Sequence, residues 1–345
     1  IFILCKNMNR VFHKIFSYKN IKTTPISLGY FVKKPVNILY PQDISNKIKS
    51  ELEVRLAQRV IKLSSFPNYL REFKEVLDVK QLYVNSFKEI NNFNNIKYTE
   101  DFAKFGNLLE KIKDRHQNVP LSISEAVQEY KKISNEKPEV LNKVLDEFYH
   151  SRVGIRTLID YYNFLFTKKK YKNYLRCDIR EAIECAAADA QTASYQFYKD
   201  HSKIPGIKIY IKDDPIIPYT QGNLHFIAFE ILKNGMRAMI ENDINKPLEV
   251  NVIDTTDYFI FVFRDYGPSV RHTEVDKLFD YSFTSVGDDE KHKKKLLAGF
   301  GHGLPLSRLY ARFFGGNLIF IPYYGIKSEV IFYLNKSVAT FETEI

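Results

Sequence analysis

The feature that most constrains the fold of this chain is a change of hydrophobic periodicity near residue 170. Between residues 44 and 166, apolar side chains recur three and four positions apart, which is the spacing of amphipathic helices. Beyond residue 178, helical stretches mix with short alternating segments such as residues 208–212 (KIYIK), which are typical of strands. The sequence therefore predicts a helical region followed by a region of helices and sheet.

The helical region, residues 44–167, consists of helical pieces joined by short polar breaks. Helices connected in this way usually run antiparallel in a bundle. We therefore expect an antiparallel four-helix bundle. The predicted helical pieces cover residues 50–61, 68–87, 99–113, 122–132 and 138–166.

The second region, residues 173–336, alternates between helical and strand patterns. Helices grouped with a mainly antiparallel or mixed sheet predict an α+β domain. We expect residues 337–345 to form a short tail after it. The predicted helices cover residues 178–198, 223–242 and 305–314, and the predicted strands 208–212, 248–254, 258–264, 317–322 and 329–334.

Residues 1–43 differ in charge from the rest of the chain. The first acidic residue is Asp43, and the preceding lysines and arginines are interleaved with Phe, Ile and Tyr. A basic, acid-free and amphipathic start predicts a mitochondrial transit peptide with a flexible N-terminus. A disordered basic tail is the simpler alternative.

Charge and cysteine content exclude several other classes of protein. The net charge is +10, but 51 basic residues are interleaved with 41 acidic ones, which favours a solvated surface and an acidic protein partner over nucleic acid. No apolar run is long enough for a transmembrane helix. The three cysteines have neither disulfide nor zinc-site spacing.

Four polar side chains share one face of the predicted helix 223–242. Glu230, Lys233, Asn234 and Arg237 follow the i, i+3, i+4, i+7 spacing. Taken alone, this pattern is more typical of an ordinary helix surface with salt bridges.

Two glycine loops change that interpretation. A predicted buried strand runs into Asp265 and Gly267, and a second loop alternates glycines from Gly299 to Gly303 before the next helix. Alternating glycines allow close approach of the backbone to phosphates, and amides at a helix start favour anionic oxygens. A lone glycine loop is a weak signal, but the order of all three elements indicates a nucleotide site.

These three elements resemble the N, G1 and G2 boxes of the GHKL ATPases. Within that superfamily the chain resembles the mitochondrial 2-oxoacid dehydrogenase kinases, which act on pyruvate or branched-chain dehydrogenase complexes. The resemblance spans residues 45–334 and implies a helical bundle followed by a GHKL (Bergerat-type) α/β sandwich. The supporting stretches are residues 51–57, 115–130, 151–159, 230–238 and 299–312.

The resemblance implies a role for each site residue. Glu230 would be the general base that deprotonates the substrate serine, assisted by His116. Asn234 would bind Mg²⁺ through its amide oxygen, and Asp265 would accept a hydrogen bond from the adenine amino group. The other implied ATP contacts are Lys233, Arg237, Gly267, Thr284, Ser285, Gly299, Phe300, Gly301, His302, Gly303, Leu304 and Ser328.

The implied protein is an ATP- and Mg²⁺-dependent protein serine kinase of the mitochondrial matrix. It would phosphorylate and inactivate the E1 subunit of a 2-oxoacid dehydrogenase complex, dock on the lipoyl domain of the E2 core, and form a homodimer through its ATP-binding domains. Residues 152–156 and 280–285 and the short tail resemble the branched-chain kinases, whereas residues 307–312 resemble the pyruvate group. We expect the branched-chain complex by a small margin.

Departures from the family pattern leave two alternatives open. Pro268 and Ser269 replace two glycines of the G1 box, and Phe226 and Tyr162 replace family histidines. A catalytically weak or inactive GHKL-fold binding protein of the complex is one alternative. A histidine kinase is the other, and its nearest phosphoacceptor candidate, His150, lacks the acidic neighbour expected after it.

Overall fold

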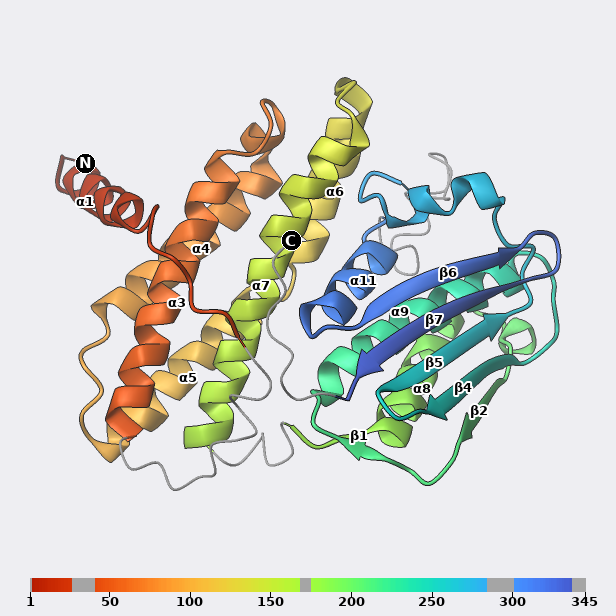
Figure 1. Ribbon diagram of the computed structural model, residues 1–345. Helices are drawn as coiled ribbons and strands as arrows, with labels where there is room; N and C mark the ends of the chain where they lie inside the picture. Colours follow the sequence, from red (N-terminus) through yellow and green to blue (C-terminus); the bar gives the residue numbers. More distant parts are fainter. Residues whose placement is uncertain (1, 27–40, 168–174, 284–300, 337–345) are drawn as a thin grey trace. The chain divides into compact units, whose positions relative to one another are not determined.

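The computed structural model describes residues 2–26, 41–167, 175–283 and 301–336 of the chain (Figure 1). Of these, residues 2–26 and 41–167 form one compact unit, and residues 175–283 and 301–336 form a second. None of the helices in these ranges is long and apolar enough to cross a membrane.

The first unit consists of helices. Helix α3 packs against α4 and α7, α4 packs against α6, and α5 packs against α7. Residues 116–118 separate α5 from α6, and the contacts among these helices are those of a bundle. The helices are α1 (Phe2–Ser17), α3 (Pro41–Ser64), η1 (Leu70–Glu72), α4 (Lys74–Asn92), α5 (Thr99–Arg115), α6 (Val119–Ile133) and α7 (Pro138–Phe166).

Local sequence explains where several of these helices begin. Pro138 stands in the first turn of α7, where its missing amide hydrogen costs nothing and its fixed φ suits the helix. The carboxylate of Asp101 accepts hydrogen bonds from the amides of Lys97 and Tyr98, both at 3.0 Å, and so caps α5. The apolar faces then meet in a core that includes Leu56, which is fully buried.

The segment before α3 is packed onto this bundle. Ile15 and Ile26 are buried, and the Tyr18 hydroxyl donates a hydrogen bond to Glu53 of α3 at 3.0 Å. The Arg55 guanidinium donates to the carbonyl of Thr24 at 2.7 Å. Residues 15–26 are therefore part of the folded unit. The transit peptide predicted for residues 1–43 stays a prediction, and residues 27–40 lie outside the described ranges.

The second unit is built on a five-stranded mixed sheet with the order β2-β4-β5-β7-β6. Strands β2 and β4 are parallel, and the other neighbouring pairs are antiparallel. The pairing of β5 with β7 sets Asp265 opposite Ser328. The strands are β2 (Ile207–Ile211), β4 (Leu248–Asp254), β5 (Tyr258–Asp265), β6 (Asn317–Tyr323) and β7 (Lys327–Asn335).

Helices α8 (Ile179–Tyr198), α9 (Gln221–Ile240) and α11 (Gly303–Phe313) cover one face of this sheet (Figure 1). Alternate side chains such as Phe261, Phe263 and Phe332 are buried on this face, whereas the intervening residues of the same strands are more exposed. This alternation is the ordinary consequence of the two-residue strand repeat. The predicted α+β fold class is confirmed.

A second, small sheet lies outside the predicted pattern. It pairs β1 (Cys177–Asp178) with β3 (Ile216–Ile217) in antiparallel fashion. Asp178 is the last residue of β1, and its carboxylate accepts a hydrogen bond from the amide of Glu181 at 3.0 Å and caps α8. The pairing therefore fixes the start of the helix that packs against α9.

Candidate active site

A cavity of about 280 Å³ lies in the second unit, along the side of α9. Its wall is formed by α9, the ends of β5 and β7, and the first residues of α11. The predicted site residues that line it are Glu230, Asn234, Arg237, Asp265, Gly301, Gly303, Leu304 and Ser328.

Helix α9 approaches the sheet closely because residue 235 is glycine. A Cβ atom on Gly235 would lie 3.0 Å from the Cβ of Asp265 and 3.0 Å from a methyl carbon of Leu248, which is tighter than ordinary packing. The close approach brings Asn234, one residue earlier, and the end of β5 to the wall of the same cavity. The glycine of this helix is therefore a packing requirement of the site.

The Glu230 carboxylate is held from two sides. The Lys233 ammonium lies 2.7 Å from one carboxylate oxygen and 2.8 Å from the other, and both residues are buried, with 9% exposure for Glu230 and 6% for Lys233. A Cβ atom on Gly303 would lie 2.3 Å from Glu230 Oε2, so the start of α11 touches the carboxylate. A buried, oriented carboxylate at a cavity wall has the geometry that a general base needs.

Lys233 pairs with Glu230 and does not line the cavity in the described part of the chain. Its ammonium lies over the Phe229 ring, 5.1 Å from the centroid. The structure thus places Lys233 beside Glu230 instead of at the cavity wall. Its contact with the nucleotide stays a prediction.

Asp265 is the buried acid at the end of β5. Its Oδ1 accepts a hydrogen bond from the Gly267 amide at 2.9 Å, and the residue is only 8% exposed. Burial raises the pKa of Asp265 to about 6, although the Gly267 amide and the Ser328 hydroxyl favour the charged form. A carboxylate has acceptor sites for further hydrogen bonds, so this residue can accept one from an amino group of a ligand.

The turn before α11 has no room for a side chain at position 301. Gly301 has a φ of +83°, and a Cβ atom there would lie 2.1 Å from the carbonyl oxygen of Phe283. The first residue of α11 is Gly303, whose amide belongs to the hydrogen-bond donors that a helix start presents to anions. The turn therefore has the construction of an anion-binding loop.

His302 lies between these glycines, but its ring turns into the protein. It is 3% exposed and packs edge-on against Tyr281, with ring centroids 5.0 Å apart. Burial lowers the pKa of His302 to about 3, so the ring is neutral at physiological pH. Its side chain is not part of the cavity wall; a nucleotide contact would have to come from its backbone. The predicted contacts Thr284, Ser285, Gly299 and Phe300 lie outside the described residues.

His116, the predicted assistant of the base, belongs to the first unit. It is buried, its Nε2 lies 2.8 Å from the Ser86 hydroxyl, and its ring packs edge-on against Tyr83 at 4.5 Å. Burial, with the positive charges of Arg152 and Arg115, lowers the pKa of His116 to about 4. These contacts explain a structural role, and its catalytic role stays a prediction.

Sequence reasoning missed several residues of the cavity wall, most of them apolar. Ala238 and Asn242 continue the four-residue spacing of Glu230 and Asn234, so this periodicity could have identified them. Phe320 and Val330 line the cavity from β6 and β7, and no sequence signal links them to α9. Their side chains give the cavity an apolar surface against which a purine ring can pack.

The residues present fit Mg²⁺ and ATP. Asn234 supplies an amide oxygen at the cavity wall, the Gly301 turn and the start of α11 provide backbone donors, and Asp265 provides a buried acceptor. In the described ranges, no group of three or more His, Cys, Asp or Glu residues could hold a metal ion. Magnesium usually keeps several water ligands and binds substrate phosphates, so one protein ligand such as Asn234 would be sufficient.

Comparison with known proteins agrees with this geometry. Residues 25–188 match the family model described as mitochondrial branched-chain alpha-ketoacid dehydrogenase kinase. Residues 220–338 match the family model of the histidine kinase-, DNA gyrase B-, and HSP90-like ATPases.

Several curated relatives match most of the chain. The mitochondrial [pyruvate dehydrogenase (acetyl-transferring)] kinase of Arabidopsis thaliana is 28% identical over 340 residues, which is 92% of this chain and 91% of the relative. The corresponding isozyme 4 of Rattus norvegicus is 30% identical over 317 residues, which is 83% of this chain and 75% of the relative. The chain belongs to the family of mitochondrial 2-oxoacid dehydrogenase kinases, with an ATPase domain of the GHKL type.

Proposed function

We propose that this protein is an ATP-dependent protein serine kinase that phosphorylates and thereby inactivates the E1 subunit of a mitochondrial 2-oxoacid dehydrogenase complex. The main support is that Glu230, Asn234 and Asp265 line one cavity together with the glycine turn at Gly301. A general base, a magnesium ligand, an adenine acceptor and a phosphate loop are the parts that phosphoryl transfer from ATP to a hydroxyl requires.

In this proposal, the Glu230 carboxylate accepts the proton of the substrate serine. Lys233 and the start of α11 hold the carboxylate in place, which reduces the entropy that must be lost when the hydroxyl arrives. Backbone amides at Gly303 and the guanidinium of Arg237 would stabilise phosphate charge. Magnesium held by Asn234 would neutralise the charge of the nucleotide phosphates.

Substrate choice between the two complexes is left to experiment. The matching relatives named above are pyruvate dehydrogenase kinases, whereas the family model that matches residues 25–188 has the branched-chain name. The small preference for the branched-chain complex drawn from residues 152–156 and 280–285 has no support from these relatives. Both E1 subunits must therefore be compared as substrates.

We also infer a homodimer formed through the second unit. On the face of the sheet opposite the helices, Tyr210, Ile253, Tyr258 and Ile319 are between 37% and 49% exposed. Apolar side chains exposed together on one face are typical of an interaction surface. A second copy of the same face would cover them.

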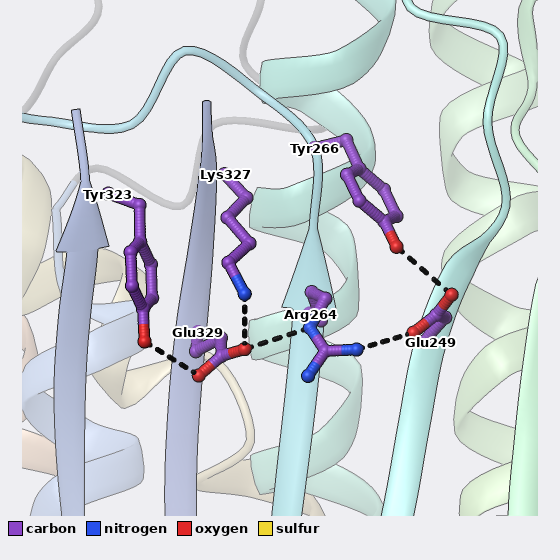
Figure 2. Close-up of polar contacts among 6 residues, drawn as sticks. All are labelled: Glu249, Arg264, Tyr266, Tyr323, Lys327 and Glu329. Carbon is purple, nitrogen blue, oxygen red and sulfur yellow. Dashed lines mark hydrogen bonds and ion pairs between the residues drawn. The ribbon is translucent and has the colours of Figure 1, made fainter. Parts of the chain in front are cut away.

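A charged network crosses the same face (Figure 2). Arg264 of β5 donates to Glu249 of β4 at 2.7 Å and to Glu329 of β7 at 2.8 Å. Lys327 donates to Glu329 at 2.9 Å, and the Tyr266 and Tyr323 hydroxyls donate to Glu249 and Glu329. Because its charges are already paired, this network can be covered by a partner with a smaller desolvation cost than isolated charges would impose.

We propose the location and the further partners from the resemblance to the family. We propose the mitochondrial matrix as the compartment, and the lipoyl domain of the E2 core as the docking partner of the helical unit. The net charge of +10 suits an acidic partner. A lipoylated domain that neither binds the protein nor changes its kinase activity would exclude this docking.

The experiment that tests the proposed function is transfer of labelled γ-phosphate from Mg-ATP to purified pyruvate and branched-chain E1 subunits. We expect label on an E1 serine, faster with one of the two substrates, and the faster substrate identifies the complex. Nucleotide binding without transfer to either E1 would instead favour the non-catalytic binding protein. Label on a histidine of the chain itself would favour a histidine kinase.

A further inference from the structure

Ser269 has an unusual backbone conformation for a serine. Its φ is +60°, in the left-handed region that glycine adopts readily and other residues adopt rarely. A residue held in this region lowers the stability of the fold unless something compensates, and such residues cluster at ligand sites. Ser269 stands where the G1 box pattern has glycine, so this chain carries a side chain there despite the cost.

The Ser269 side chain has a second cost. Its hydroxyl oxygen is buried and has no hydrogen-bond partner in the described residues. A buried hydroxyl without a partner is unfavourable, and such a group in a native protein calls for an explanation, such as strain or a functional role. Ser269 lines the same cavity as Asp265 and Ser328.

The loop that presents Ser269 is fixed on both sides. Gly267 is so close to α9 that a Cβ atom on it would lie 2.8 Å from the Cβ of Ala238. The carbonyl of Pro268 accepts a hydrogen bond from the Gly325 amide, at the turn between β6 and β7, at 2.6 Å. Ser269 is therefore held in its conformation before any ligand binds, which reduces the entropy cost of binding.

The position of Ser269 relative to the residues of α9 indicates which part of a ligand it would contact. Glu230 stands at one end of the cavity, where the transferred phosphate must arrive. Ala238, which Gly267 contacts, is eight residues further along the helix, or about 12 Å at 1.5 Å per residue. Ser269 follows Gly267 by two residues, a reach of at most about 7 Å, and lines the cavity. We therefore place it in the half of the cavity away from Glu230.

We propose that the Ser269 hydroxyl forms a hydrogen bond with the nucleoside part of a bound purine nucleotide. This inference rests on the proposed function only in that the cavity binds ATP. A hydroxyl can donate to a ring nitrogen or ribose oxygen and can also accept from an amino group. Glycine at this position has no side chain to make the contact, so Ser269 increases the affinity for the nucleoside.

The test is the dissociation constant of Mg-ADP and Mg-ATP, measured by calorimetry for wild type and three variants. Ser269→Ala keeps a side chain but lacks the hydroxyl. Ser269→Gly lacks the hydroxyl and also removes the strain of a side chain at a left-handed φ. We expect both substitutions to raise the dissociation constants of ADP and ATP equally, by about threefold to tenfold, which corresponds to about 0.7–1.4 kcal/mol of binding free energy. The exposed Ser202, whose hydroxyl bonds Asp200, supplies the matched control Ser202→Ala, with unchanged affinity.

The outcomes separate this inference from the proposed function. If wild type binds both nucleotides and Ser269→Gly retains its affinity, the hydroxyl makes no contact and the inference is wrong. A loss confined to ATP would also overturn it, because the contact would then involve the terminal phosphate. If wild type binds neither nucleotide, the proposed function fails as well. A higher thermal midpoint of Ser269→Gly than of Ser269→Ala without nucleotide shows that both variants fold and that the φ is strained.

Discussion

Replacement of Lys233 by methionine tests the arrangement around Glu230. The substitution keeps most of the side-chain volume but removes the ammonium that lies 2.7 Å from the carboxylate. Glu230 would then be a buried carboxylate without its cation. We expect lower stability of the second unit and slower phosphoryl transfer, because the carboxylate either moves or draws water into the site.

The size of the effect follows from burial and distance. At 2.7 Å and an effective dielectric constant of about 20, the attraction is about 6 kcal/mol before the desolvation of both groups is subtracted. Removal of one partner from a buried pair typically costs about 3–5 kcal/mol. Because Glu230 lines a cavity that water can enter, we expect the lower limit, about 3 kcal/mol, or a fall of about 6–12 °C in the thermal midpoint.

The assay is thermal unfolding of wild type, Lys233→Met, Glu230→Gln and the double variant. The transition that Mg-ATP shifts upward reports on the second unit, because a ligand stabilises the unit that binds it. We expect the loss of unfolding free energy in the double variant to be about 1.5–3 kcal/mol smaller than the sum of the losses in the single variants, since the second substitution removes the unpaired charge. Lys233→Arg should recover part of the stability.

Two results would refute this reasoning. Additive losses, within about 0.5 kcal/mol, would show that Lys233 and Glu230 do not interact in solution. A large fall in ATP affinity of Lys233→Met would show that the ammonium contacts the phosphates, as the family resemblance implies. Unchanged ATP affinity with a turnover at least about tenfold lower is the result expected of a positioning residue.

Three further predictions concern other parts of the second unit. Gly303→Ala should lower phosphoryl transfer by about 100-fold, with nucleotide affinity nearly unchanged, because the added Cβ would lie 2.3 Å from Glu230 Oε2 and would displace the carboxylate; steady-state kinetics and calorimetry check both values. The pKa of Asp265 is about 6 in the folded protein and 3.8 for an unperturbed aspartate, so the native form binds more protons between these values. The free energy of unfolding should therefore fall by about 2 kcal/mol as the pH rises from 4 to 6, out of about 3 kcal/mol over the whole titration. Denaturant unfolding of Asp265→Asn should lack this fall, and a fall in the variant as large as that of the wild type would contradict the assignment. Ile331 pairs with Ile319 on the face of the sheet opposite the helices. Ile331→Asp should give a monomer in sedimentation analysis that still binds ATP, and an unchanged mass would argue against that interface.

Much of the fold can be predicted because long periodic segments indicate their own structure. The bounds predicted for residues 138–166 and 248–254 are the ones that α7 and β4 have. The strands β1 and β3 escape prediction because two residues cannot show a period. Helix α11 begins at Gly303, two residues before the predicted start, since Pro305 is compatible with the first turn of a helix.

The site is less predictable because helix spacing is a coarse guide to direction. The spacing assigns Lys233 and Asn234 to one face with Glu230, but consecutive residues differ by about 100° around a helix. Lys233 lies about 60° to one side of Glu230 and Asn234 about 40° to the other, so only Asn234 reaches the cavity. The contact of Gly303 with Glu230 depends on tertiary packing, which no local pattern reports.

The most direct test of the proposed kinase activity is a comparison of wild type and Glu230→Gln in phosphate transfer from Mg-ATP to E1, with nucleotide affinity measured for both. We predict serine phosphorylation by wild type, a loss of at least about 100-fold in the variant, and ATP binding by both proteins. Equal transfer by the two proteins would contradict the assignment of Glu230 as the base. No transfer by wild type to either E1, despite ATP binding, would contradict the kinase itself.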